Sequence, residues 1–141
     1  NIPDIVLVLE GINDIMHPYV FDHKDEIVAA EDLEKGMSGI IETVHRYARP
    51  VLVGTVMPFW DEQYNIWFEK GNQVRLEFNA WIREQSGADG VIDYDKAAAD
   101  EETPGRMKEG IHIGDGLHPN TRGGELMADL AFEAIKSKLK I

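Results

Sequence analysis

The chain has 141 residues, of which 26 are Asp or Glu and 14 are Lys or Arg, so its formal net charge is −12. This length favours a single domain, and a hydrophobic fraction of 43% is sufficient for a packed core. The acidic balance argues against binding to nucleic acid or to an anionic membrane surface, both of which attract basic proteins. Cysteine is absent, which excludes thiol catalysis, and no apolar run reaches the length of a membrane span.

Strands and helices are predicted to alternate along the chain. The continuous apolar run of residues 5–9 predicts a buried strand, and residues 15–29 are expected to form a loop with a short helix. An apolar stripe at three- and four-residue spacing predicts a helix over residues 31–48. The remaining expected elements are strands at 51–57 and 90–94, a helix at 72–85, a polar loop at 96–109 and a closing helix at 121–139.

This alternation is typical of an α/β fold in which helices cover a parallel sheet. Ligands of such sheets bind beyond the carboxyl ends of the strands. The first strand runs into Gly-Ile-Asn-Asp at 11–14, and the second runs into Pro-Phe-Trp at 58–60. After the third strand, the chain returns through Asp-Gly-Leu-His at 115–118 before the last helix. We therefore expect these polar and aromatic residues to share one rim of the sheet.

The residue types on this rim are those of nucleophilic catalysis. A carboxylate such as Asp115, three residues before His118, can hold the imidazole in one tautomer and stabilise it once it takes a proton. Asn13 can donate a side-chain N–H to a developing oxyanion, and Gly11 allows a tight turn before it. Each feature also has an ordinary interpretation, because Asp, Asn and Gly are common turn residues.

Two short motifs resemble conserved blocks of one hydrolase family. The sequence GIND at 11–14 resembles the third block of the SGNH (GDSL-type) hydrolases, Gly-x-Asn-Asp, and DGLH at 115–118 resembles the fifth block, Asp-x-x-His. The flanking sequences VLEGINDI, NAWIR, GVIDYDKA and LHPNTRGGELMADLA are similar to those of the secreted lipase/acylhydrolase-like and carbohydrate-acetylesterase-like subgroup. The resemblance covers nearly the whole chain.

The resemblance implies a flavodoxin-like three-layer α/β/α fold with a parallel sheet, and a serine-dependent esterase, lipase or acetylesterase activity. It implies that Asn13 is an oxyanion donor, that His118 is the general base, and that Asp115 orients it, with Gly11 and Asp14 supporting the loop. It implies an ester substrate, either an acyl ester or an acetylated carbohydrate, and no cofactor or metal. It also implies secreted or extracytoplasmic localisation.

The chain departs from the family pattern in one essential part. The Gly-Asp-Ser block that carries the nucleophile and the block that supplies an oxyanion glycine are both missing. The three serines, Ser38, Ser86 and Ser137, fall in or at the ends of predicted helices, which makes them poor nucleophiles. We therefore expect residues 1–141 to be the C-terminal portion of a single domain whose N-terminal strands lie elsewhere. A separate N-terminal chain or segment would bring the serine, or the chain would self-associate through the open edge of its first strand.

Other interpretations are also open at this point. The chain could be a non-catalytic module that binds carbohydrate or acyl groups on an esterase-like scaffold. An unrelated flavodoxin-like domain ranks lower, because the first strand is not followed by a Gly-rich phosphate loop. Phe59 and Trp60, together with Tyr64 and Trp67, are expected either to wall a substrate pocket or to belong to the core. The other histidines (His17, His23, His45 and His112) show no metal-ligand spacing.

Overall fold

A computed structural model describes residues 2–60 and 65–140 of the chain, with the side chains of 65–68 left out. Three short parallel strands form a sheet in the order β1 (Val6–Val8), β2 (Val51–Gly54) and β3 (Gly90–Ile92). Five α-helices and a 3₁₀ helix are described around it: α1 (Ile12–Val20), η1 (Lys24–Glu26), α2 (Ala30–Arg46), α3 (Asn65–Glu84), α4 (Tyr94–Ala98) and α5 (Thr121–Leu139). The α/β fold with a parallel sheet is as the sequence predicted.

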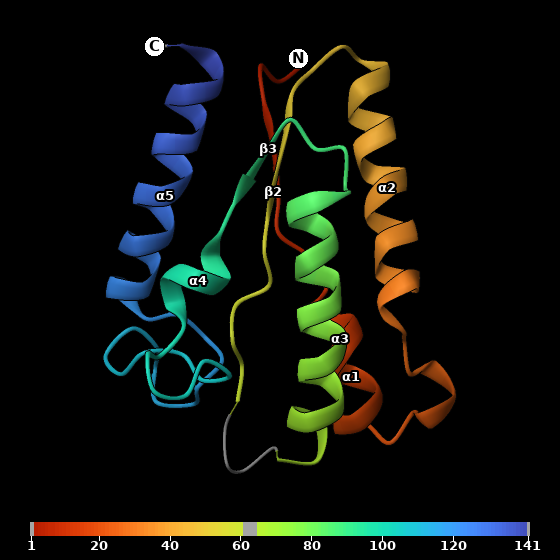
Figure 1. Ribbon diagram of the computed structural model, residues 1–141, viewed down its shortest axis with the longest axis vertical. Helices are drawn as coiled ribbons and strands as arrows, with labels where there is room; N and C mark the ends of the chain where they lie inside the picture. The colour runs from red at the N-terminus through yellow and green to blue at the C-terminus, as the bar shows by residue number, and fades with distance from the viewer. Residues whose placement is uncertain (1, 61–64, 141) are drawn as a thin grey trace.

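The elements form three layers, with α2 and α3 on one side of the sheet and α5 on the other (Figure 1). Successive residues of a strand point to opposite faces, and β2 shows this directly. Val51 and Val53 pack in the larger core, with apolar residues of α2 and α3, whereas Leu52 packs in the smaller core with residues of β3 and α5. All four residues of β2 are buried, so this central strand is apolar throughout.

The strand β1 is less covered than β2. It pairs with β2 and, among the described residues, with no other strand. Leu7 is 42% exposed and Leu9 is 38% exposed. Since alternate residues share a face, both lie on the face of the sheet that α5 covers farther along, at β3. One edge of the sheet therefore has exposed apolar side chains beside it.

Several element boundaries differ from the sequence prediction. The short helix expected within residues 15–29 begins earlier, at Ile12, and includes Pro18; Ile15 and Pro18 are buried, and their packing outweighs the lost backbone hydrogen bond. The helix α3 begins at Asn65 rather than at residue 72. A short helix, α4, replaces the end of the expected third strand and the start of the expected polar loop, and the side chain of Asp93 caps it by accepting the N–H of Lys96.

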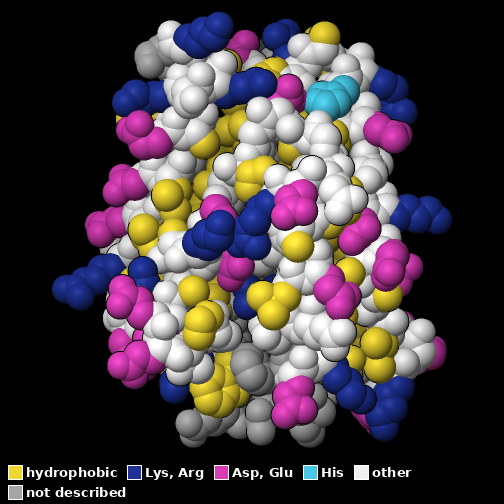
Figure 2. All heavy atoms as spheres, viewed as in Figure 1, with side chains coloured by type: hydrophobic (Ala, Val, Ile, Leu, Met, Phe, Trp, Pro, Cys, Tyr) yellow, Lys and Arg dark blue, Asp and Glu magenta, His cyan; other side chains and the backbone are white. Residues whose placement is uncertain are grey.

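The surface carries the negative charge in a dispersed form. On the face seen in Figure 2, Asp and Glu side chains alternate with Lys and Arg, and apolar side chains lie between them. Ion pairs such as Lys136–Glu133 and Lys96–Asp93 contribute to this mixture. No helix in the described part of the chain combines the length and the apolar character that a membrane span requires.

Candidate active site

The chain turns sharply where β1 ends, and this turn places Asn13 on the rim. Gly11 is the N-cap residue of α1 and has φ of +118°, a conformation that residues with a side chain rarely adopt. A Cβ atom at this position would also lie 3.1 Å from the ring of Phe78. The helix therefore begins soon after the strand, with only Leu9, Glu10 and Gly11 between them, and Asn13 is exposed on its first turn.

Asp14 follows Asn13 on the same exposed turn but faces a different hollow. That hollow lies between α1 and α2 and is lined partly by Asp32, Met37 and Phe78. The bracing role expected for Asp14 stays a prediction.

Asp115 and His118 form a close pair in the loop before α5. The imidazole Nδ1 of His118 lies 2.6 Å from Oδ2 of Asp115. The other carboxylate oxygen, Oδ1, accepts the backbone N–H groups of Leu117 at 3.0 Å and of His118 at 2.9 Å. An ionised carboxylate can only accept hydrogen bonds, so in the neutral ring Nδ1 carries the proton and Nε2 keeps its lone pair. This is the tautomer that a general base needs.

The environment of Asp115 keeps its carboxyl group ionised. Burial by itself raises the pKa of this group, but the hydrogen bonds from the His118 ring and from two backbone N–H groups outweigh burial and lower the pKa to about 2. The side chain of His118, in contrast, is 67% exposed and stands at the surface. The pair therefore combines a fixed negative charge with an accessible imidazole.

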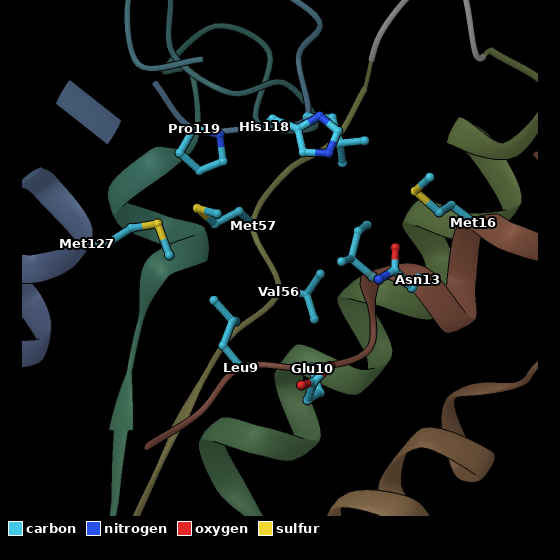
Figure 3. Close-up of a pocket in the computed structure, with 11 residues that line it drawn as sticks. Leu9, Glu10, Asn13, Met16, Val56, Met57, His118, Pro119 and Met127 are labelled. Carbon is cyan, nitrogen blue, oxygen red and sulfur yellow. The ribbon is translucent and has the colours of Figure 1, made fainter. Parts of the chain in front are cut away.

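His118 and Asn13 line the same cavity. Its volume is about 300 Å³, and it opens between the carboxyl ends of β1 and β2, the start of α1 and the start of α5. Figure 3 shows His118 and Asn13 on different walls of this cavity. The lining is mostly apolar: Leu9, Glu10, Ile12, Asn13, Met16, Val56, Met57, Leu117, His118, Pro119 and Met127. Two residues from opposite ends of the sequence thus meet at one apolar site.

A buried polar network holds the floor of this cavity. The side chain of Asn79 accepts the N–H of Val56 and donates to its carbonyl oxygen, both at 2.8 Å. Arg75, which is 1% exposed, donates to the same carbonyl oxygen at 3.2 Å and pairs with Asp95. Asp95 also accepts from Arg83 at 2.7 Å. Helix α3 therefore fixes the backbone that follows β2.

Arg75 and Asn79 were not among the site residues predicted from the sequence. The signal that could have found them is their spacing, because they follow Gly71 by four and eight residues on the face that also carries Phe78 and Ile82. Polar residues on the buried face of a helix need partners in the interior.

Of the aromatic side chains directly after β2, the structure describes Phe59 and Trp60, and neither lines this cavity. The pocket role expected for Phe59 stays a prediction, and its side chain, which is 1% exposed, belongs to the larger core. It packs there because the chain turns inward beneath α1 and α3, beside Gly71. Trp60 is half-buried, and the guanidinium of Arg106 lies 4.9 Å from the centre of its ring. Tyr64 and the side chain of Trp67 lie outside the described residues.

None of the three serines lines the cavity. Ser38 is in the middle of α2. Ser86, after α3, donates to the carbonyl oxygen of Ile82 at 2.9 Å. Ser137 is in the last turns of α5, beside Asp89 at the far end of the strands. In the described part of the chain, no group of three or more His, Asp or Glu side chains is arranged to hold a metal ion.

Comparison with known proteins identifies the family. The sequence profile of the GDSL-like lipase/acylhydrolase family matches residues 2–126. The chain belongs to this family. The resemblance found in the two motifs is thereby confirmed, and the chain is a member of a hydrolase family. No curated protein sequence gives a significant match.

Solved structures of two hydrolases share the fold. A GDSL-like lipase from Bacteroides thetaiotaomicron is 16% identical with a TM-score of 0.72, and the match covers 96% of this chain and 63% of the lipase. An acetyl-xylooligosaccharide esterase from Geobacillus stearothermophilus is 18% identical with a TM-score of 0.69, and the match covers 95% of this chain and 60% of the esterase. The chain thus spans about three fifths of the length of the structures it matches.

Two variants of the Geobacillus stearothermophilus esterase indicate which residue types are catalytic in that enzyme. Structures in which one serine or one histidine is replaced by alanine are described as catalytic mutants. Both types of residue are therefore described as catalytic in the esterase.

Proposed function

We propose that this chain supplies the His–Asp pair and an oxyanion donor to a serine-dependent carboxylic ester hydrolase. The observation that carries the proposal is that His118, paired with Asp115 at 2.6 Å, lines one apolar cavity together with Asn13. A cavity of this kind, mostly apolar with a few polar groups at its edge, is typical of sites for small organic ligands.

The reaction follows from the roles of these groups. A serine Oγ attacks the ester carbonyl carbon while Nε2 of His118 takes the hydroxyl proton, and the carbonyl oxygen becomes an oxyanion. Asn13 donates to that oxyanion; a donor of this type contributes about 3–4 kcal/mol to lowering the barrier. His118 then gives the proton to the departing alcohol, and water, activated by the same imidazole, releases the acid. Asp115 holds His118 in the required tautomer, and no cofactor takes part.

The serine itself comes, in this proposal, from outside these 141 residues. The three serines of the chain are at other places in the fold, and the relatives of known structure are longer than the chain. Residues 1–141 are then the C-terminal portion of a single domain, and the nucleophile lies on an N-terminal segment or a separate chain.

The exposed edge of β1 is where this segment would dock. An added parallel strand would end beside Gly11 and Asn13, because the carboxyl ends of parallel strands meet at one rim. It would also cover Leu7 and Leu9, which are 42% and 38% exposed. Self-association of two copies through the same edge is the competing arrangement.

We further propose that the substrate is an ester with a small acyl group, including an acetylated carbohydrate. The cavity of about 300 Å³ beside His118 is lined by Met16, Met57 and Met127 among other apolar residues. Methionine side chains adapt to ligands of different shapes. The acetyl-xylooligosaccharide esterase that shares the fold is consistent with this substrate class.

Phosphonate labelling tests the proposal. The whole protein, as its gene encodes it, is treated with a serine-reactive fluorophosphonate and assayed with p-nitrophenyl acetate, and the labelled residue is located by mass spectrometry. We expect one labelled serine outside these 141 residues and loss of turnover upon labelling. The His118→Ala variant should resist labelling. An unlabelled and inactive protein that still binds acetylated sugars would instead show a non-catalytic binding module.

A further inference from the structure

The loop that carries Asp115 and His118 is closed into a small ring of hydrogen bonds. His112 and Pro119 form an isolated antiparallel bridge at its base. The N–H of Ile113 donates to the carbonyl oxygen of His118 at 3.0 Å. The segment between these residues is therefore a defined loop, and its internal contacts decide where the His–Asp pair points.

The imidazole of His112 occupies the inside of this loop. Its Nδ1 accepts two backbone N–H groups, from Gly114 and from Gly116, each at 3.1 Å. These two glycines flank Asp115 and have positive φ angles of +104° and +67°. One ring nitrogen thus holds the peptide groups on both sides of the carboxylate that orients His118.

Any movement of this backbone passes directly to the His–Asp pair. Asp115 accepts hydrogen bonds within the same loop, from the N–H groups of Leu117 and His118 and from the His118 ring. A carboxylate held by hydrogen bonds from its own loop follows the backbone of that loop. The position of the Gly114–Gly116 segment therefore sets the position of the carboxylate.

The two histidines of the loop require opposite tautomers. Nδ1 of His112 accepts two donors, so it must carry a lone pair, and the proton of the neutral ring is on Nε2. Nδ1 of His118 faces a carboxylate, so there the proton is on Nδ1. Protonation of His112 at Nδ1 would place an N–H against two other N–H groups and remove both hydrogen bonds.

Asn120 fixes the backbone of His112 from the other side. Its side-chain Nδ2 donates to the carbonyl oxygens of Gly110 and His112, both at 2.9 Å, while its Oδ1 caps α5 by accepting the N–H of Gly123. The loop is therefore anchored to the first turn of α5, and the ring of His112 is presented to the glycines from a fixed base.

We propose that His112 is a positioning residue of the active site: by accepting the N–H groups of Gly114 and Gly116, it sets the geometry and the tautomer of the Asp115–His118 pair. This inference rests on the proposed function for its catalytic meaning. A hydrophobic ring of the same size would fill the space but would leave both N–H groups without their acceptor. The role thus depends on the δ nitrogen and not on bulk.

Tautomers give the first test, and they need no activity. The whole protein, as its gene encodes it, is labelled with ¹⁵N-histidine, and long-range ¹H–¹⁵N correlations are recorded at about pH 8, where an ordinary histidine is neutral. We expect His112 with its proton on Nε2 and His118 with its proton on Nδ1. A proton on Nδ1 of His112 would overturn the proposal.

A matched pair of variants gives the second test. His112→Asn keeps an acceptor oxygen near the place of Nδ1, whereas His112→Gln moves it toward the place of Nε2. We expect His112→Asn to keep His118 in the Nδ1–H tautomer and His112→Gln to give a mixture. With p-nitrophenyl acetate, His112→Gln should lower kcat by roughly 10- to 100-fold, the cost of misplacing a catalytic group by about 1 Å, with KM nearly unchanged.

The outcomes separate this inference from the proposed function. If the natural protein hydrolyses no ester, the proposed function fails, and the tautomer of His118 in the two variants still decides whether His112 positions it. If both variants keep the natural tautomer of His118, or lose it equally, His112 has no positioning role. If His112→Gln does not fold, His112→Asn and a scalar coupling between Nδ1 and the Gly114 and Gly116 amides in the natural protein decide the question.

Discussion

Two histidine–carboxylate pairs occupy opposite ends of the sheet. At the carboxyl ends of the strands, Nδ1 of His118 lies 2.6 Å from Asp115. At the other end, Nε2 of His45 lies 2.8 Å from Asp89. In both pairs, burial raises the pKa of the carboxyl group, hydrogen bonds outweigh burial, and the pKa falls to about 2. By distance and charge the two pairs are nearly equivalent.

The two pairs differ in the groups that surround their carboxylates. Asp89 joins three elements, since it pairs with His45 of α2, accepts the N–H of Val51 of β2 at 2.9 Å, and accepts from Lys138 of α5 at 3.1 Å. Asp115, in contrast, is bonded within its own loop, and its histidine faces a cavity. A His–Asp pair that links elements stabilises the fold, whereas one that faces an apolar cavity is available for chemistry.

The largest expected effect is on activity. In the whole protein, His118→Ala should lower kcat/KM by at least about 1,000-fold, because a triad without its base keeps little catalysis. His45→Ala should leave kcat/KM within about twofold, since that pair is at the far end of the sheet. Hydrolysis of p-nitrophenyl acetate checks both. Equal losses in the two variants would show that the rim pair is not chemically special.

The ion pair between Arg75 and Asp95 is buried, so it extends the comparison to a pair that is shielded from solvent. Arg75→Met should lower the free energy of unfolding by about 3 kcal/mol, as expected when one partner of a buried ion pair is lost; Asp95 then keeps Arg83 as its remaining partner. Urea unfolding measures the change. Lys70→Met, at an exposed position of the same helix, is the matched control and should change stability by less than about 0.5 kcal/mol.

The stability effect of the two carboxylates should also differ. Asp89→Asn should lower the free energy of unfolding by about 1–3 kcal/mol, because it weakens charge-assisted bonds that connect α2, β2 and α5. Asp115→Asn should cost less than Asp89→Asn, because the bonds of Asp115 lie within its own loop and connect no other element. Urea unfolding of both variants decides the point. A larger loss for Asp115→Asn would reverse the assignment of roles.

The smallest expected effect concerns acid titration. A carboxyl whose folded pKa is lowered stabilises the fold fully above its ordinary pKa of 3.8, and this contribution is lost as the pH falls through about 2. NMR titration of the carboxyl carbons should therefore show midpoints of about 2 for Asp115 and Asp89. In His118→Ala, the Asp115 midpoint should rise toward 3.8 while that of Asp89 stays the same. An unchanged Asp115 midpoint would mean that the backbone bonds alone lower it.

The sequence by itself determined the features that depend on neighbouring residues. Apolar periodicity located the strands and the helices α2 and α5, because burial on one face repeats at the spacing of the element. Gly-x-Asn-Asp and Asp-x-x-His could be recognised for the same reason, since each motif is completed within four residues and its turn geometry is local.

Only the tertiary structure decided which distant residues meet. It placed Asn13 and His118 in one cavity, put Phe59 in the core, and buried Arg75 and Asn79 beneath Val56. It also placed the ring of His112 within hydrogen-bond distance of the backbone on both sides of Asp115. It put the Asp115–His118 pair and the similar His45–Asp89 pair at opposite ends of the sheet. The residues next to a polar side chain in the sequence predict that it is exposed. The partners that make its burial favourable come from elements far along the chain, so the sequence alone does not reveal them.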